Sequence, residues 1–192
     1  MRLWYINIDI PNLLEESLKA ASIVKRGEYH YFIHPISDGV PYLEPSLLKE
    51  VTDRILAVAN PGFDKILTIE AMGIHIGTAF ALSTGLPLSI IRKRPYHLPN
   101  EVEIDQSTGY SKGKLFMNGI SKGERLIIID DVISTGGTMK AVCSAVEKIG
   151  AVICDVVVVI ERGVGAEHLR HSGYPLKTLV KLEVDSKGVK LI

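Results

Sequence analysis

The side chains best suited to chemistry lie in one run of the chain, residues 126–138, which reads LIIIDDVISTGGT. Its four leading apolar residues predict a short buried strand, and Asp130 and Asp131 stand at the carboxyl end of that strand. Adjacent carboxylates accept hydrogen bonds from hydroxyl groups and would repel a phosphate. The pair therefore favours a ligand with a diol, such as a sugar.

The turn that follows suits the opposite end of such a ligand. It combines small hydroxyl residues with two glycines and leads into a helix predicted over residues 139–149, which Gly150 closes. Such a turn presents backbone N–H groups to an anion, and the helix dipole favours negative charge there. The run lacks the Lys-Ser/Thr of a P-loop and the glycine spacing of a dinucleotide fold. The structural alternative is an ordinary strand–turn–helix in which Asp130 caps the helix.

Strands and helices alternate along the part of the chain that must position this run. Helices are predicted from Pro45 and over residues 74–83. Short apolar strands are predicted over residues 65–69, 86–91, 126–129, 152–160 and 177–184, the last of which would end the fold. This order predicts an α/β fold with a mostly parallel twisted sheet flanked by helices. Ligands bind outside the carboxyl ends of such strands, so the loops 70–73, 92–99 and 130–138 should line one crevice.

The first 44 residues do not fit this alternation. They predict a helix over residues 11–25, a strand over residues 29–34 and a turn-rich crossing over residues 37–44. We expect residues 1–44 to form a small cap, or hood, over the crevice. Residues 1–192 as a whole are expected to form a single domain, because their number suits one α/β core.

Composition excludes several classes of function. Lys plus Arg equals Asp plus Glu, at 22 each, and no basic stripe is present, which argues against nucleic-acid binding. No apolar run approaches the roughly 20 residues of a membrane-spanning helix, and the N-terminus has no signal-peptide pattern. Cys143 and Cys154 predict buried thiols in a reducing cytoplasm. The six histidines lack the spacing of metal ligands, so we assign no metal to them.

Residues 129–138, IDDVISTGGT, resemble the binding signature for phosphoribosyl pyrophosphate (PRPP) of type I phosphoribosyltransferases. The resemblance extends from about Leu43 to Val184 and is closest to the purine branch, in particular the archaeal hypoxanthine/guanine type. It implies the type I phosphoribosyltransferase fold and transfer of a 5-phosphoribosyl group to hypoxanthine or guanine in purine salvage. Mg²⁺ is the implied cofactor, PRPP and a purine base are the implied ligands, and a homodimer is the implied assembly. Adenine or xanthine as the base, and a PRPP-sensing regulator without turnover, remain alternatives.

The resemblance also implies roles for individual residues. Asp130 and Asp131 would bind the 2- and 3-hydroxyls of the ribose. The 5-phosphate would lie against Ser134, Thr135, Gly136, Gly137 and Thr138. The pyrophosphate would contact Ala71, Met72, Gly73, Arg92 and Lys93. Adenine-type enzymes usually carry Arg where this chain has Met72, which counts against a plain adenine-type assignment.

The remaining implied roles concern the mobile lid and the base. Residues 97–113 resemble the catalytic lid of the family, and Tyr110 is the match to its tyrosine. Xanthine-type relatives carry Lys at the place of Arg162, where a cation faces an oxo group of the base. Because a guanidinium only donates hydrogen bonds, Arg162 favours 6-oxopurines, although a surface ion pair with Glu161 is equally compatible with the sequence. Base contacts are also expected from the cap, at Val40, Pro41 and Tyr42.

Overall fold

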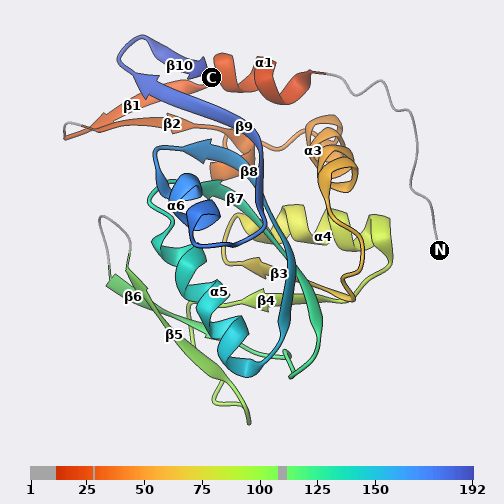
Figure 1. Ribbon diagram of the computed structural model, residues 1–192. Coiled ribbons are helices and arrows are strands. Elements are labelled where there is room, and N and C mark those ends of the chain that lie inside the picture. The colour runs from red at the N-terminus through yellow and green to blue at the C-terminus, as the bar shows by residue number, and fades with distance from the viewer. Residues whose placement is uncertain (1–11, 28, 108–111) are drawn as a thin grey trace.

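The computed structural model describes residues 12–27, 29–107 and 112–192. A six-stranded sheet forms its centre, with the strand order β10-β9-β8-β7-β3-β4 (Figure 1). Neighbouring strands of this sheet run parallel, except that β10 pairs antiparallel with β9. The strands are β3 (Lys65–Ile69), β4 (Leu88–Ile91), β7 (Arg125–Ile133), β8 (Val152–Arg162), β9 (Leu176–Asp185) and β10 (Gly188–Leu191).

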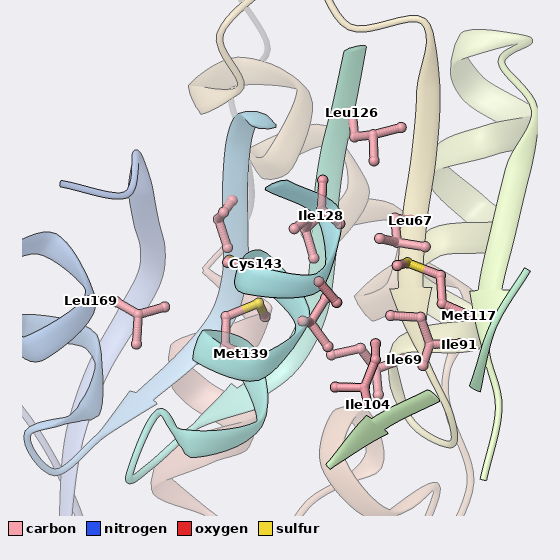
Figure 2. Packing of buried hydrophobic residues seen from close by; sticks show 14 of the residues in the cluster. Leu67, Ile69, Ile91, Ile104, Met117, Leu126, Ile128, Met139, Cys143 and Leu169 are labelled. Atoms are coloured by element: carbon pink, nitrogen blue, oxygen red, sulfur yellow. The ribbon is translucent and has the colours of Figure 1, made fainter. Parts of the chain in front are cut away.

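Helices cover both faces of this sheet. One face carries α1 (Leu13–Lys19), α3 (Pro45–Val58) and α4 (Gly73–Thr84), and the other carries α5 (Gly137–Ile149) and α6 (Gly165–His171). Successive side chains of a strand point to opposite faces, so Ile127 and Ile129 pack in the first core. Leu126 and Ile128 pack in the second core, to which Met139 of α5 also belongs (Figure 2). The predicted α/β fold with a mostly parallel sheet flanked by helices is confirmed.

The central strand β7 is longer than the sequence predicts. It continues past Ile129 to Ile133, because Asp130 pairs with Val158 and Val132 with Ile160 on β8. The two carboxylates are therefore held in the sheet itself. The helix α5 begins two residues earlier than predicted and ends at Gly150, which adopts the left-handed conformation that closes a helix.

The N-terminal elements differ from the prediction of one long helix. The helix α1 buries Leu14 and Leu18 but ends at Lys19, and β1 (Ser22–Arg26) follows. The prediction of helix as far as residue 25 is therefore wrong, since this segment pairs antiparallel with β2 (Tyr29–Ile33). A short helix, α2 (Pro35–Asp38), leads back towards the sheet. The antiparallel pair β1–β2, with α1 and α2, forms the hood, and β9 and β10 lie beside it (Figure 1).

A two-stranded hairpin occupies the predicted lid. Its strands β5 (Val102–Ser107) and β6 (Lys112–Met117) pair antiparallel. Ile104, Leu115 and Met117 pack in the same core as α5, so the body of the hairpin is anchored on the domain. Tyr110 belongs to residues 108–111, which lie outside the described part of the chain, so its role stays a prediction.

The C-terminal part of the chain contains one strand more than predicted. β9 matches the strand predicted over residues 177–184, but it is not the last, because β10 returns antiparallel beside it. Within the described residues, no helix is both long enough and apolar enough to cross a membrane.

Candidate functional site

A pocket of about 550 Å³ opens at the carboxyl ends of β7 and β8, the edge where the sequence predicts the crevice. Its volume falls in the range of small-molecule sites. The pocket is lined from the β7–α5 connection by the residues 130–139, and from β8 by Arg162. The hood contributes Tyr29, Tyr31, Phe32 and Ser37. Residues far apart in the sequence therefore surround one cavity.

The predicted phosphate loop forms one end of the pocket. Gly136 has a φ of 77°, a left-handed conformation that favours glycine, and α5 begins at the next residue. Among the described residues no side chain caps this helix, so its first N–H groups are available to an anion. Ser134, Thr135, Gly136, Gly137 and Thr138 all line the pocket, as expected of a phosphate site.

Gly165 fixes the shape of this loop from behind. Its backbone N–H donates to the carbonyl of Ser134 at 2.8 Å. A Cβ atom at Gly165 would lie 2.3 Å from the nitrogen of Gly136 and 2.4 Å from the oxygen of Ser134. Only glycine therefore fits at this position. The sequence analysis missed Gly165, although a glycine that follows the next parallel strand is the kind of residue that close backbone packing requires.

Asp130 and Asp131 line the pocket beside the loop. Burial, and then the charge of Asp131, raise the pKa of Asp130 well above its ordinary value. Burial also raises the pKa of Asp131 to about 6, and the charge of Asp38 on α2 adds to this shift. Asp38 is held in place by hydrogen bonds from the Tyr31 hydroxyl at 2.9 Å and from Ser37 Oγ at 2.7 Å. The carboxyl groups of this wall of the pocket suit ligand hydroxyls.

The predicted pyrophosphate loop, residues 70–73, adjoins these carboxylates. A Cβ atom at Gly73 would lie 2.3 Å from Thr68 Oγ1 and 2.8 Å from Asp130 Oδ1, so the loop can approach Asp130 only with glycine here. Met72 precedes the first turn of α4, and in the described structure no side chain caps that helix. Ala71 is exposed. The loop thus presents small groups and a helix start to one side of Asp130.

Arg92 is oriented on the same loop. Its Nε donates to Glu70 Oε2 at 2.8 Å, and the backbone N–H of Lys93 donates to the same oxygen at 3.0 Å. These two contacts lower the pKa of Glu70, the backbone N–H of Lys93 contributing most. Nε holds Glu70, and the Arg92 guanidinium also lies 5.8 Å from the centre of the Tyr96 ring. Arg92 and Lys93 lie next to the 70–73 loop. Neither they nor Ala71, Met72 and Gly73 line the main pocket, so of the three loops expected to share one crevice only 130–138 lines it.

Arg162 lines the pocket from the carboxyl end of β8, against the hood. Its Nη2 donates to the carbonyl of His30 at 2.7 Å, and its Cζ lies 4.0 Å from the centre of the Tyr29 ring. Its other N–H groups can donate to a ligand. Glu161 is buried and pairs instead with Arg170, at 2.7 Å, and with Lys181, at 3.1 Å. The alternative of a Glu161–Arg162 surface pair is therefore wrong.

The cap residues chosen from the sequence are not those that the structure brings to the pocket. Val40 is 50% exposed and Tyr42 is 64% exposed, and neither lines the cavity. Gly39 has a left-handed backbone and lies beside Met72, and residues 40–42, which follow it, do not line the pocket. The aromatic side chains of β2 take their place, with Phe32 almost fully buried. Alternation of aromatic and polar residues in β2 was the available signal.

The chain is similar to proteins of known family. The model of the phosphoribosyl transferase domain matches residues 46–191. A hypoxanthine/guanine phosphoribosyltransferase of Methanocella paludicola is 56% identical over 93% of this chain and 94% of its own. A protein of the same name from Methanocaldococcus vulcanius is 59% identical over 90% of this chain and 95% of its own.

Solved structures show the same fold. An adenine phosphoribosyltransferase of Thermoanaerobacter pseudethanolicus superposes with a TM-score of 0.72 at 24% identity, over 88% of this chain and 99% of that one. The enzyme of the same name from Rhodothermus marinus gives a TM-score of 0.71 at 24% identity, over 88% of this chain and 98% of that one. At this identity the likeness concerns the fold alone.

Proposed function

The chain belongs to the phosphoribosyltransferase family, and on that premise we propose that it transfers the 5-phosphoribosyl group of PRPP to hypoxanthine and to guanine. The products are the nucleoside monophosphates IMP and GMP, together with pyrophosphate, so the activity is purine salvage. The observation that carries the proposal is one pocket that is lined by adjacent carboxylates, a phosphate loop and Arg162. The names of relatives at 56% and 59% identity support the choice of base.

The reaction breaks the bond between C1 of the ribose and a pyrophosphate oxygen, and forms a bond from C1 to a ring nitrogen of the base. The base nitrogen loses its proton, and the leaving pyrophosphate carries away the electron pair. Positive charge develops on the sugar in between. Carboxylates of Asp130 and Asp131 hold the ribose hydroxyls beside this charge, and the 134–138 loop fixes the 5-phosphate.

Pyrophosphate is assigned to the neighbouring loop. Residues 71–73 offer backbone N–H groups, and the guanidinium of Arg92, which Glu70 orients through Nε, offers N–H donors to phosphate oxygens. Lys93 adds a second cation. These groups offset the negative charge of the leaving group as the bond breaks.

Mg²⁺ is the proposed cofactor. The described residues contain no cluster of three or more His, Cys, Asp or Glu side chains that could hold a metal alone. This arrangement fits Mg²⁺, which is commonly held by one or two carboxylates, water and the oxygens of a phosphorylated substrate. Asp130 and Asp131 would share it with the ribose hydroxyls and the pyrophosphate, and the ion would supply charge neutralisation of the leaving group.

The purine is assigned to the space between Arg162 and the aromatic side chains of β2. Arg162 can donate to O6 of hypoxanthine or guanine, whereas the 6-amino group of adenine also donates and would leave both donors unpaired. Tyr29 holds the guanidinium from its other side. Adenine and xanthine are the alternative bases for the same transfer chemistry.

A homodimer is the proposed assembly, and the cytoplasm is the proposed compartment. Tyr42, Leu82 and Leu98 are large apolar side chains that stay exposed on a single chain, and a partner chain would cover such surface. Cys143 and Cys154 are free thiols, as is usual in a reducing compartment. Light scattering should give a mass about twice the 21.1 kDa of one chain, and a mass near 21.1 kDa would refute the dimer.

A turnover assay tests the proposed activity. The chain is supplied with PRPP, Mg²⁺ and each of hypoxanthine, guanine, adenine and xanthine in turn, and nucleotide and pyrophosphate are measured. We expect kcat/KM to be about tenfold or more higher for hypoxanthine and guanine than for adenine, because the 6-amino group of adenine would face the donors of Arg162 without an acceptor. A preference for adenine would overturn the base assignment, and no turnover with any base would overturn the transfer reaction.

A further inference from the structure

One side chain outside the pocket contacts the phosphate loop directly. Gln106, on β5, donates from Nε2 to the Oγ1 of Thr138 at 2.7 Å. Thr138 lines the pocket as the second residue of α5, whereas Gln106 does not line it. Gln106 therefore reaches the predicted 5-phosphate site only through the Thr138 hydroxyl.

The direction of this hydrogen bond determines what Thr138 can do. A threonine hydroxyl has one proton to donate and two lone pairs with which to accept. Since Gln106 occupies a lone pair, the proton stays available, and the groups that accept it best in this pocket are the oxygens of a phosphate. An acceptor in the place of Nε2 would have the opposite effect, because it would take up the proton of Thr138.

The position of Gln106 is set by the packing of the hairpin. Side chains two residues apart on a strand share a face, so Gln106 shares the face of Ile104. Ile104 is 4% exposed and packs in the core that contains Met139 of α5 (Figure 2). Gly113 stands opposite Gln106 in the pairing of β5 with β6, so no side chain competes from that position. The contact is thus anchored on both sides of the hydrogen bond.

We propose that Gln106 is a positioning residue that holds the Thr138 hydroxyl ready to donate to the 5-phosphate of the ribosyl ligand, and that ties the β5–β6 hairpin to this end of the pocket. The proposal rests on the proposed function. It assigns part of the affinity for the phosphoribosyl group to a residue that touches no substrate. Affinity for the purine base is not affected.

Steady-state kinetics and calorimetric binding of ribose 5-phosphate test the proposal with two variants. Gln106→Ala removes the donor, and we expect KM for PRPP and Kd for ribose 5-phosphate to rise about threefold to tenfold, the worth of one neutral hydrogen bond. Gln106→Glu supplies an acceptor and a negative charge, so its effect should exceed that of Gln106→Ala. KM for hypoxanthine should stay within about twofold in both variants, since the base is assigned to Arg162 and the β2 aromatic side chains and not to Thr138.

A matched control and a double variant separate positioning from simple support of the hairpin. Glu103→Ala breaks the exposed Glu103–Lys114 pair of the same hairpin, at 2.6 Å, and should leave KM for PRPP unchanged. In a Thr138→Val background, Gln106→Ala should have almost no further effect, because its partner is absent. Full additivity of the two changes, or a Gln106→Ala protein with wild-type KM and Kd, would overturn the proposal. A wild-type chain that neither uses PRPP nor binds ribose 5-phosphate would overturn the proposed function itself.

Discussion

The parts of the pocket assigned to the ribose-phosphate end and to the base end of the ligand are built in different ways. The ribose-phosphate end is mostly backbone of one stretch, residues 130–138, and the close contact of Gly165 fixes its shape. The base end is made of side chains from separate elements, with Arg162 of β8 held between the His30 carbonyl and the Tyr29 ring of the hood. A change at the first end should therefore affect every base alike, whereas a change at the second should redistribute activity among bases.

The largest expected effect is at the ribose end. Asp130→Asn together with Asp131→Asn removes the carboxylates that accept from the ribose hydroxyls, and should lower kcat/KM by about 10³-fold or more. The loss should be equal for hypoxanthine and guanine, as measured by turnover with each base. A double variant with near-wild-type rates would contradict the assignment of the sugar site.

The same double variant should be more stable than the wild type without ligand. Burial raises the pKa of both carboxyl groups, to about 6 for Asp131. A raised carboxyl pKa in the folded state destabilises the fold as pH rises from the unfolded pKa through the folded one, so the cost from Asp131, whose folded pKa is about 6, is nearly complete at pH 7. Thermal unfolding at pH 7 should show a Tm higher by about 2–6 °C. A lower Tm would contradict the direction of the pKa shifts.

The next effect concerns the backbone of the phosphate loop. Gly165→Ala adds a methyl group that would lie 2.3 Å from the backbone nitrogen of Gly136. Because this is closer than van der Waals contact allows, the loop must move. We expect KM for PRPP to rise about tenfold to a hundredfold, with about 1–3 kcal/mol lost from the free energy of unfolding. Gly173→Ala is the control for stability alone, because a left-handed glycine there meets no neighbour within 4 Å. Unchanged KM for PRPP in Gly165→Ala would contradict the supporting role of this glycine.

Arg162→Ala should distinguish most clearly between residues that act on the base and residues that act on the ribose-phosphate. It removes the donor assigned to O6, so kcat/KM should fall about tenfold to a hundredfold with hypoxanthine and guanine and much less with adenine. Arg94→Ala, which removes an exposed cation outside the pocket, is the matched control and should change neither. Equal losses with all bases in Arg162→Ala would place Arg162 at the ribose-phosphate end instead.

The smallest effect concerns the hood. His34 is fully buried, its Nδ1 accepts from the backbone N–H of Ile36, and burial lowers its pKa to about 4. A histidine with a lowered pKa loses stability as pH falls from its unfolded value near 6.5 through its folded one. Urea unfolding at pH 7 and pH 5 should therefore show about 1–2 kcal/mol less stability from this group at pH 5.

His34→Asn isolates that contribution. It should flatten the fall in stability between pH 6.5 and pH 5, because the neutral side chain no longer titrates. The carboxyl pair contributes the opposite slope over this range, so Asp131→Asn should make the fall steeper. Parallel pH profiles for the wild type and His34→Asn would contradict the assigned titration of His34.

The sequence predicted one end of the pocket much better than the other, for a physical reason. Residues 130–138 act as a contiguous strand–turn–helix, so their types and order alone specify the phosphate loop. The parallel sheet followed from the alternation of apolar strands with helices. At the base end, the contact between Tyr29 and Arg162 depends on how the hood packs on β8 and β9. Local sequence patterns do not predict that packing.

The site residues that sequence reasoning got wrong or did not find also depend on packing between distant elements. Val40 and Tyr42 were expected at the base as part of the cap, but they do not line the pocket, and the β2 aromatic side chains line it instead. Gly165 and Gln106 act on the phosphate loop from other elements, and neither has a motif of its own. The local pattern of residues 22–25 predicts helix, whereas pairing with β2, a contact that this pattern does not contain, makes the segment a strand.

A crystal structure of the chain with IMP and Mg²⁺ tests the central claim most directly, because it locates both ends of the ligand at once. The account predicts the 5-phosphate against residues 134–138, the ribose hydroxyls at Asp130 and Asp131, and O6 of the purine within hydrogen-bond distance of Arg162. A phosphate bound elsewhere, or a purine ring away from Arg162 and the β2 aromatic side chains, would contradict it.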